Sequence, residues 1–183
     1  MEGPSNGVGL TVLDSITTMH VMGLRVELAE ALEFIKTRLS FRKEIEGSTF
    51  ETSIRMLGSL LSMYELTGEQ DKKLLDMARD IGDRLLWSYN TTGGLPHSTV
   101  GFSSHRHFNQ QWIGGSAVLS EFGTVQLEMR TLSFHTKDPT YDIKTTHVMD
   151  IIDARCPQDM LCPCYMNKVS VVPQWLGIRC RVP

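Results

Sequence analysis

The stretch Phe50–Gly68, FETSIRMLGSLLSMYELTG, reads as one amphipathic helix. Its apolar residues recur at alternating steps of four and three, which is the spacing of a single helix face. They are Phe50, Ile54, Leu57, Leu61 and Tyr64. Such a face has to pack against other helices, so this stretch predicts a layer of neighbouring helices around it.

A second, polar stripe runs beside the apolar one, displaced by one residue or about 100° around the helix. It consists of Glu51, Arg55, Gly58 and Ser62. A carboxylate and a guanidinium at the border of a core are costly to desolvate unless they pair or meet a ligand. Two interpretations follow: a surface ion pair between Glu51 and Arg55, or a binding site. Gly58 would let another group approach the helix backbone closely.

The same helical periodicity continues on both sides of this stretch, and no strand-like alternation competes with it. Further helices are predicted over residues 10–22, 26–39, 70–89, 115–134 and 140–154. Residues 90–111 are rich in Gly, Ser, His and Asn and are expected to form a long ordered loop. Helices in antiparallel pairs joined by short turns predict an all-α chain in the form of an α/α toroid. About six helices cannot close such a ring, so we expect an incomplete arc.

The predicted helix over residues 115–134 repeats the arrangement of Phe50–Gly68. Its apolar stripe is Val118, Phe122, Val125, Met129 and Leu132, and its polar stripe is Glu121, Thr124, Glu128 and Thr131. In the helix over 140–154, Ile143, Val148, Ile151 and Ile152 are expected to point inward. Acidic stripes on several helices have a plain interpretation as solvated faces. They would form a site only if Glu51 and Glu121 turn toward a common hollow.

Four stretches together resemble motifs of the class I α-1,2-mannosidases, glycoside hydrolase family 47, which are calcium-dependent enzymes that trim high-mannose N-glycans. The stretches are GLTVLDSITTMHVMGL (Gly9–Leu24), FETSIRMLGSLLSMYELTG (Phe50–Gly68), TGGLPHSTV (Thr92–Val100) and GSAVLSEFGTVQLEM (Gly115–Met129). The resemblance runs from about Gly9 to Asp153. Within the family, Phe50–Gly68 is most similar to the endoplasmic-reticulum processing type.

The resemblance implies a fragment of an (α/α)7 barrel and a set of site residues. Glu51 falls where the family places a general acid that acts through a water, and Arg55 and Glu121 fall on positions that contact the sugar. Asp14 and Glu128 are candidate acidic residues of the same site. Inverting glycosidases need one carboxylic acid to protonate the leaving oxygen and a second carboxylate to activate water. Clustered carboxylates raise one another's pKa, which suits an acid that works near neutral pH.

The sequence also departs from the family pattern. Thr17 stands where the family has a second Asp, and Gly101 stands where it usually has Asn. The resemblance does not extend to the C-terminal half of the family domain, which holds the general base, a second acid candidate and the Thr that binds Ca²⁺. No residue of this chain is therefore nominated as a metal ligand. We expect a fragment or truncated product with negligible mannosidase activity on its own.

Two alternatives to an enzyme remain open. One is an inactive homologue that binds mannose-containing glycans in glycoprotein quality control and endoplasmic-reticulum-associated degradation, which Thr17 favours slightly. The other is a helical scaffold whose acidic stripes only face solvent. The scaffold requires Glu51 and Glu121 to point to different sides of the fold.

Composition narrows the classes of molecule that this chain can be expected to bind. The 183 residues carry a formal net charge of -3 and no basic run, which argues against a nucleic-acid partner. No signal peptide and no membrane-crossing apolar run is visible. The expected partner, a high-mannose N-glycan, and the expected location, the lumen or membrane of the endoplasmic reticulum or Golgi, therefore rest on the resemblance. Membrane association would need a segment that is not present here.

The four cysteines all lie near the C-terminus, at positions 156, 162, 164 and 180. We divide the chain into a partial mannosidase-like domain, residues 1–155, and a Cys-containing tail, residues 156–183. The tail is expected to be unrelated sequence or poorly ordered. A small zinc site or a disulfide cluster is the alternative, since Cys162 and Cys164 form a C-x-C pair.

The expected loop carries two motifs that the resemblance does not explain. Asn90-Thr91-Thr92 is a glycosylation sequon, which matters if the chain enters the secretory lumen. His105 and His107 suggest a metal site, but a solvent-exposed pair is the preferred interpretation because no acidic or Cys partner is fixed nearby.

Overall fold

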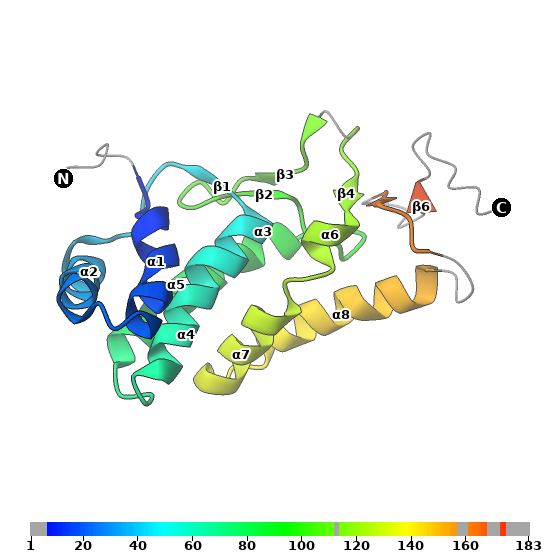
Figure 1. Cartoon of the computed structure of the whole chain (residues 1–183). Coiled ribbons are helices and arrows are strands. Elements are labelled where there is room, and N and C mark those ends of the chain that lie inside the picture. The colour runs from blue at the N-terminus through cyan, green and yellow to red at the C-terminus, as the bar shows by residue number, and fades with distance from the viewer. Residues whose placement is uncertain (1–6, 112–113, 157–160, 168–172, 175–183) are drawn as a thin grey trace.

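The computed structural model describes residues 7–111, 114–156, 161–167 and 173–174. Helices dominate these residues, and α5 lies behind α1 and α4 in the view of Figure 1. They are α1 (Leu10–Val21), α2 (Arg25–Arg38), α3 (Thr49–Glu51), α4 (Gly58–Leu66), α5 (Lys72–Leu86), α6 (Leu119–Phe122), α7 (Gln126–Thr136) and α8 (Thr140–Arg155). A π-helix, η1 (Thr52–Leu57), joins α3 to α4, and a 3-10 helix, η2 (Trp87–Tyr89), ends α5.

Helices that follow one another in the chain pack in pairs: α1 with α2, α4 with α5, and α7 with α8. The order of contacts from helix to helix is α2, α1, α4, α5, α7 and α8, and α7 also touches α4. Buried apolar side chains from all of these helices form one core. Its members include Leu13, Ile16, Ile35, Leu57, Leu60, Met63, Leu74, Ile81, Met129, Leu132, Tyr141 and Val148.

The helix expected over Phe50–Gly68 contains a π-turn that the sequence analysis did not predict. Leu57, Leu61 and Tyr64 are buried as expected, whereas Phe50 and Ile54 are only half-buried. A π-turn places an extra residue in the helix, so residues before it are rotated relative to residues after it. Thr52 and Ser53 consequently take buried positions on the part of the helix where the strict α-period placed Phe50 and Ile54.

Short strands within the described residues correct the expectation that no strands occur. In the first sheet, β1 (Glu46–Ser48) pairs antiparallel with β2 (Thr99–Gly101), which pairs antiparallel with β3 (His107–Phe108). The second sheet is β4 (Ala117–Val118), β5 (Tyr165–Met166) and β6 (Pro173–Gln174), also antiparallel. The strands have two or three residues each, and the chain remains predominantly helical. The expected loop over residues 90–111 is therefore ordered partly by sheet pairing.

The single helix expected over residues 115–134 is in fact a strand, a short helix and a longer helix. Gly123 is the C-cap of α6: its N–H makes the last helical bond, to the Leu119 carbonyl, and a β-carbon at Gly123 would stand only 2.7 Å from that oxygen. The break lets α7 turn away from α6 (Figure 1). Of the two stripes predicted here, Phe122, Val125, Met129 and Leu132 are buried as expected, and Val118 is half-buried.

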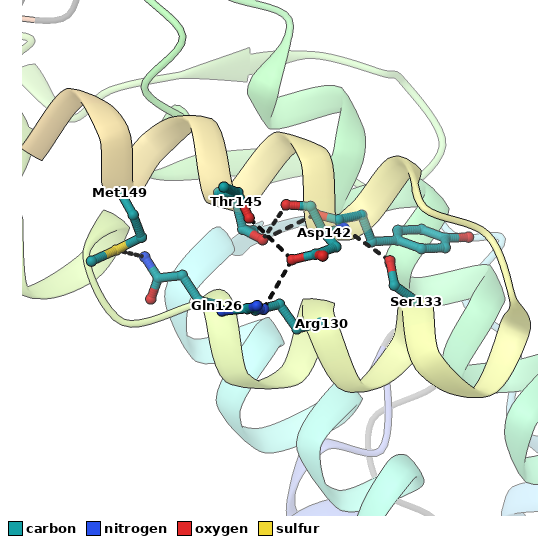
Figure 2. Close-up of polar contacts among 8 residues, drawn as sticks. Gln126, Arg130, Ser133, Asp142, Thr145 and Met149 are labelled. Carbon is teal, nitrogen blue, oxygen red and sulfur yellow. Dashed lines mark hydrogen bonds and ion pairs between the residues drawn. The ribbon is translucent and has the colours of Figure 1, made fainter.

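Polar contacts hold α7 against α8 (Figure 2). The Ser133 hydroxyl accepts a hydrogen bond from the Asp142 N–H at 2.8 Å, and Arg130 forms an ion pair with Asp142 at 2.9 Å. At the other end of the α7–α8 pair, the side-chain amide of Gln126 donates a hydrogen bond to the sulfur of Met149. The prediction that Ile143 points inward is wrong: its side chain is 62% exposed, on the face of α8 away from Tyr141 and Thr145, which are buried.

Candidate active site

Arg55 lies in η1 and links the helix formed by α3, η1 and α4, here called the central helix, to α1 through two carboxylates. Its Nη1 lies 2.9 Å from Asp14 Oδ2, and its Nε bonds to Glu51 Oε2. The three side chains are 41% to 44% exposed, so the cluster is open to a ligand rather than sealed in the core. The hydrogen bonds to Glu51 and then Asp14 raise the pKa of Arg55, which keeps the guanidinium charged.

Local sequence explains where Glu51 lies. Ser48 is the N-cap of α3, and its hydroxyl accepts a hydrogen bond from the Glu51 N–H at 3.2 Å. Ser48 and Glu51 have the spacing of a capping box, a signal that the sequence analysis missed. The Glu51 carboxylate lies in the first turn, where the helix dipole favours negative charge. Glu51 directs it toward Arg55 one turn on.

Glu121 lies on the same side of the molecule as Glu51. It belongs to α6, which contacts α3 (Figure 1). Burial raises the pKa of Glu121, and the negative charge of Glu51 raises it further. The scaffold alternative required these two carboxylates to lie on different sides of the fold, and they do not.

A groove of about 390 Å³ opens beside Glu121. Its wall is mostly polar and comes from the first sheet and the segments around it. The lining residues are Glu46, Gly47, Ser48, Ser98, Thr99, Phe108, Gln110 and Glu121. Hydroxyl, amide and carboxylate groups beside one aromatic ring are the donor and acceptor set that a sugar can bond to. The β2 side of this groove was not predicted, although the β-branched pair Thr99-Val100 was a strand signal.

Glu128 lies in the first turn of α7, which packs against η1 and α4. Its Cγ would be 3.5 Å from a β-carbon at Gly58, so the close approach expected at Gly58 is made by Glu128. Glu128 Oε2 and the hydroxyl of Tyr89 are both buried, and neither has a hydrogen-bond partner among the described residues. Burial raises the pKa of Glu128, and burial together with the charge of Glu128 raises the pKa of Tyr89.

The sequence model of glycosyl hydrolase family 47 matches residues 1–174. The chain belongs to this family. It is 39% identical over 170 residues to a mannosyl-oligosaccharide 1,2-alpha-mannosidase of Arabidopsis thaliana, covering 92% of this chain and 30% of that protein. It is 40% identical over 169 residues to the endoplasmic reticulum mannosyl-oligosaccharide 1,2-alpha-mannosidase of Schizosaccharomyces pombe, covering 90% of this chain and 32% of the relative. The family 47 chain thus spans about a third of the length of these relatives.

A solved structure shows the same fold. The alpha-1,2-mannosidase from Trichoderma reesei superposes with a TM-score of 0.82 at 24% identity, covering 92% of this chain and 38% of that one. This likeness confirms the predicted all-α arc as part of an α/α barrel. The match of the family 47 model extends beyond residue 155, into the segment that the sequence analysis separated as a tail.

The calcium dependence that the family resemblance implies stays a prediction for this chain. Calcium takes six to eight oxygen ligands, most of them carboxylates and carbonyls. The carboxylates of Asp14 and Glu51 are already paired with Arg55. No group of three or more His, Cys, Asp and Glu residues that could hold a metal occurs in the described part of the chain.

The histidines of the 90–111 segment are engaged with rings and with each other. His105 is exposed, and its ring stacks on that of Trp87 with the two ring centroids 3.5 Å apart. The expectation of an exposed pair does not hold for His107, which is half-buried in β3. Its Nδ1 lies 2.6 Å from Nδ1 of His97, beside the groove.

The cysteine segment contributes to the position of Glu121. Cys156 and Cys162 form a disulfide, so the disulfide interpretation holds for this pair, and Cys164 is free and exposed. Cys180 lies outside the described residues. The Cys164 carbonyl accepts a hydrogen bond from the Leu119 N–H at 2.8 Å, which supports the start of α6. The division at residues 155 and 156 stays a prediction.

Proposed function

We propose that this chain carries part of the active site of an inverting α-1,2-mannosidase that trims high-mannose N-glycans. In this proposal Glu51 is the general acid, and Arg55 and Glu121 bind the mannose. The observations that support the proposal are the Asp14–Arg55–Glu51 cluster and the effect of the Glu51 charge on Glu121, which lines the polar groove. Asp14, Glu51 and Arg55 are not themselves among the lining residues of that groove. The names of the family 47 relatives agree with this substrate class.

Each side chain has a distinct task. The proton that Glu51 delivers through a water goes to the leaving glycosidic oxygen, and the bond from that oxygen to the anomeric carbon breaks. Arg55 holds the Glu51 carboxylate in one orientation, and its remaining N–H groups are directed to sugar hydroxyls. Glu121, with its raised pKa, retains a proton at a higher pH than an ordinary Glu and can then donate it to a sugar oxygen.

Inversion also needs a base on the other face of the sugar, about 6.5–9.5 Å from the acid. We nominate no residue of this chain for that task, because Asp14 is paired with Arg55 and Glu128 packs against α4. Calcium chemistry is not part of the proposal for these residues. We propose that the 183-residue polypeptide alone binds mannosides weakly and releases negligible mannose.

Binding and turnover are tested separately. The purified chain is titrated with α-1,2-mannobiose while chemical shifts of backbone amides are followed by NMR. The variants Arg55→Ala and Glu121→Gln should lose binding, whereas Glu30→Gln, an exposed change on α2, should keep it. Shifts that are identical in all variants would remove the proposed site.

Turnover is measured as release of free mannose from a high-mannose glycan. The chain alone should release none above the blank, and measurable release would overturn the statement on activity. In a protein that contains this sequence together with the rest of the family domain, Glu51→Gln should abolish release. Unchanged turnover there would remove Glu51 from the mechanism.

A second candidate function is glycan binding without hydrolysis, in glycoprotein quality control and endoplasmic-reticulum-associated degradation. Thr17, which stands in place of a family Asp, favours it. The same longer protein distinguishes the two functions, since a binding homologue retains mannobiose without releasing mannose. Thr17→Asp then tests whether this departure is the cause.

We also propose that the protein acts in the endoplasmic reticulum, since two relatives carry this location in their names. The Cys156–Cys162 disulfide supports a location in an oxidising compartment. Within the described residues no helix has both the length and the apolar character needed to cross a membrane.

A further inference from the structure

The motif that the proposed site leaves unexplained is Asn90-Thr91-Thr92. It is the single Asn-X-Ser/Thr sequence in the 183 residues, with no Pro at its middle position. Such a motif is an acceptor for N-linked glycans only where it lies on the surface. Its position in the fold therefore decides whether it can be used.

Asn90 lies at the end of the 3-10 helix η2 and is exposed. Its backbone N–H bonds to the Trp87 carbonyl at 3.1 Å, so the main chain is fixed. No described residue hydrogen-bonds to its side-chain amide. The reactive nitrogen, Nδ2, is thus presented to solvent on an ordered backbone.

The rest of the motif is held by groups that glycosylation does not use. The Thr91 N–H bonds to the Tyr89 carbonyl at 2.9 Å, and the Thr91 hydroxyl donates to the Leu95 carbonyl at 2.8 Å. Thr92, whose hydroxyl defines the motif, is exposed and has no hydrogen-bond partner among the described side chains and backbone groups. The turn is therefore formed by Thr91 while both defining side chains stay accessible.

The far side of this turn packs against α8, which leaves one face outward. Gly94 has a φ of +79°, and a β-carbon there would stand 2.7 Å from His147 Nε2 and 3.1 Å from Ile151 Cδ1. Asn90 is not among the residues that line the groove beside Glu121. A glycan on Asn90 would extend into solvent without occupying the proposed mannose site.

We propose that Asn90 is an N-glycosylation site of this chain, modified when the chain enters the endoplasmic reticulum; this rests on the location proposed above. The donor is a lipid-linked oligosaccharide diphosphate. A bond forms between Asn90 Nδ2 and the anomeric carbon of the first sugar as the bond from that carbon to the phosphate oxygen breaks. The lipid diphosphate leaves, and Nδ2 loses one proton.

The test uses the full 183-residue chain behind a cleavable signal peptide, translated in the presence of endoplasmic-reticulum microsomes. Resistance to added protease establishes translocation in every sample. The wild-type chain should show one step of increased apparent mass on the gel. Peptide-N-glycosidase F should remove this step and convert Asn90 to Asp, which the peptide map detects. A translocated wild-type chain without this step would overturn the proposal.

Matched variants separate the motif from the surrounding fold. Asn90→Gln and Thr92→Ala should remove the step, and Thr92→Ser and Thr91→Ser should keep it. A step that persists in Asn90→Gln would assign the modification elsewhere and overturn the proposal. Mannobiose binding by unglycosylated chain made in bacteria is measured independently, so failure of either proposal does not decide the other.

Discussion

The Cγ of Glu128 on α7 lies 3.5 Å from the point where a β-carbon of Gly58 would stand on α4. That distance is an ordinary van der Waals contact, so a methyl group fits without displacing α7. At Gly82 in the middle of α5 the same construction overlaps Leu132 and comes within 3.2 Å of Tyr141. Gly58 therefore has room for a β-carbon, whereas Gly82 does not.

Gly58→Ala should stabilise the chain by about 0.5–1 kcal/mol, because Ala is favoured over Gly in a helix and the space is available. Gly82→Ala should destabilise it by roughly 1–3 kcal/mol, because the added methyl overpacks the α5–α7–α8 core. Urea unfolding of the two variants checks both signs. Equal changes for both would contradict the packing described here.

Glu128→Gln should raise the free energy of unfolding at neutral pH. Burial raises the pKa of Glu128, so the folded chain pays for ionisation that the unfolded chain does not resist. Below the ordinary Glu pKa both states are protonated and the penalty is absent. As pH rises from there, the unfolded chain ionises first and wild-type stability falls until the raised folded pKa is passed.

The gain from Glu128→Gln should therefore be largest near neutral pH and shrink toward zero at acid pH. Thermal unfolding across this range is the measurement. Glu30→Gln is the matched control, since Glu30 is exposed on α2. A gain that does not depend on pH would show that shape rather than charge is responsible.

Ser133→Ala should cost about 1 kcal/mol of stability. Pro139 at the start of α8 offers no side-chain cap, and the Ser133 hydroxyl from α7 takes the Asp142 N–H instead (Figure 2). Loss of a capping group typically costs 0.5–2 kcal/mol. Arg130→Ala is the control: the Arg130 side chain is 63% exposed, and such ion pairs contribute roughly 0–1 kcal/mol.

The Cys156–Cys162 disulfide should be found by mass spectrometry of unreduced peptides. Its removal by paired Ser substitutions should cost about 2 kcal/mol, the loop-closure contribution for a short loop. Cys164→Ser should leave stability unchanged, because Cys164 is free and exposed. A peptide that joins Cys162 to Cys164 would contradict the pairing.

Helices with an unbroken apolar period were predicted well. α5 lies within the predicted 70–89 region, and α1 and α8 match their predictions to within a residue or two. Periodicity did not predict the break at Gly123, because Phe122, Val125 and Met129 keep a helical spacing across it. Strands of two or three residues are too short to show alternation, so the sheet beside the groove was not predicted either.

Sequence reasoning named Asp14, Glu51, Arg55 and Glu121 as candidates but predicted neither their connections nor the β2 side of the groove. Glu51 and Arg55 are four residues apart on one helix, so their pairing follows from local geometry. Asp14 is 41 residues before Arg55, and only the packing of α1 against the central helix brings the two together. The partnerships of Glu128 with Gly58 and Tyr89 also depend on tertiary contact. The catalytic and binding roles of these residues remain predictions.

The π-turn at Thr52–Leu57 holds one residue more than a regular α-helix would between the same two ends. Because the extra residue is taken up within the turn, deleting one residue there would restore regular α-helical winding without rotating one end relative to the other. Leu57, Leu61 and Tyr64 would then keep their places in the core, and Glu51 would keep its place at the end of the helix that contacts α6. The helical wall and the proposed site would therefore survive the loss of one residue here, whereas a deletion within the regular turns of α4 would separate them.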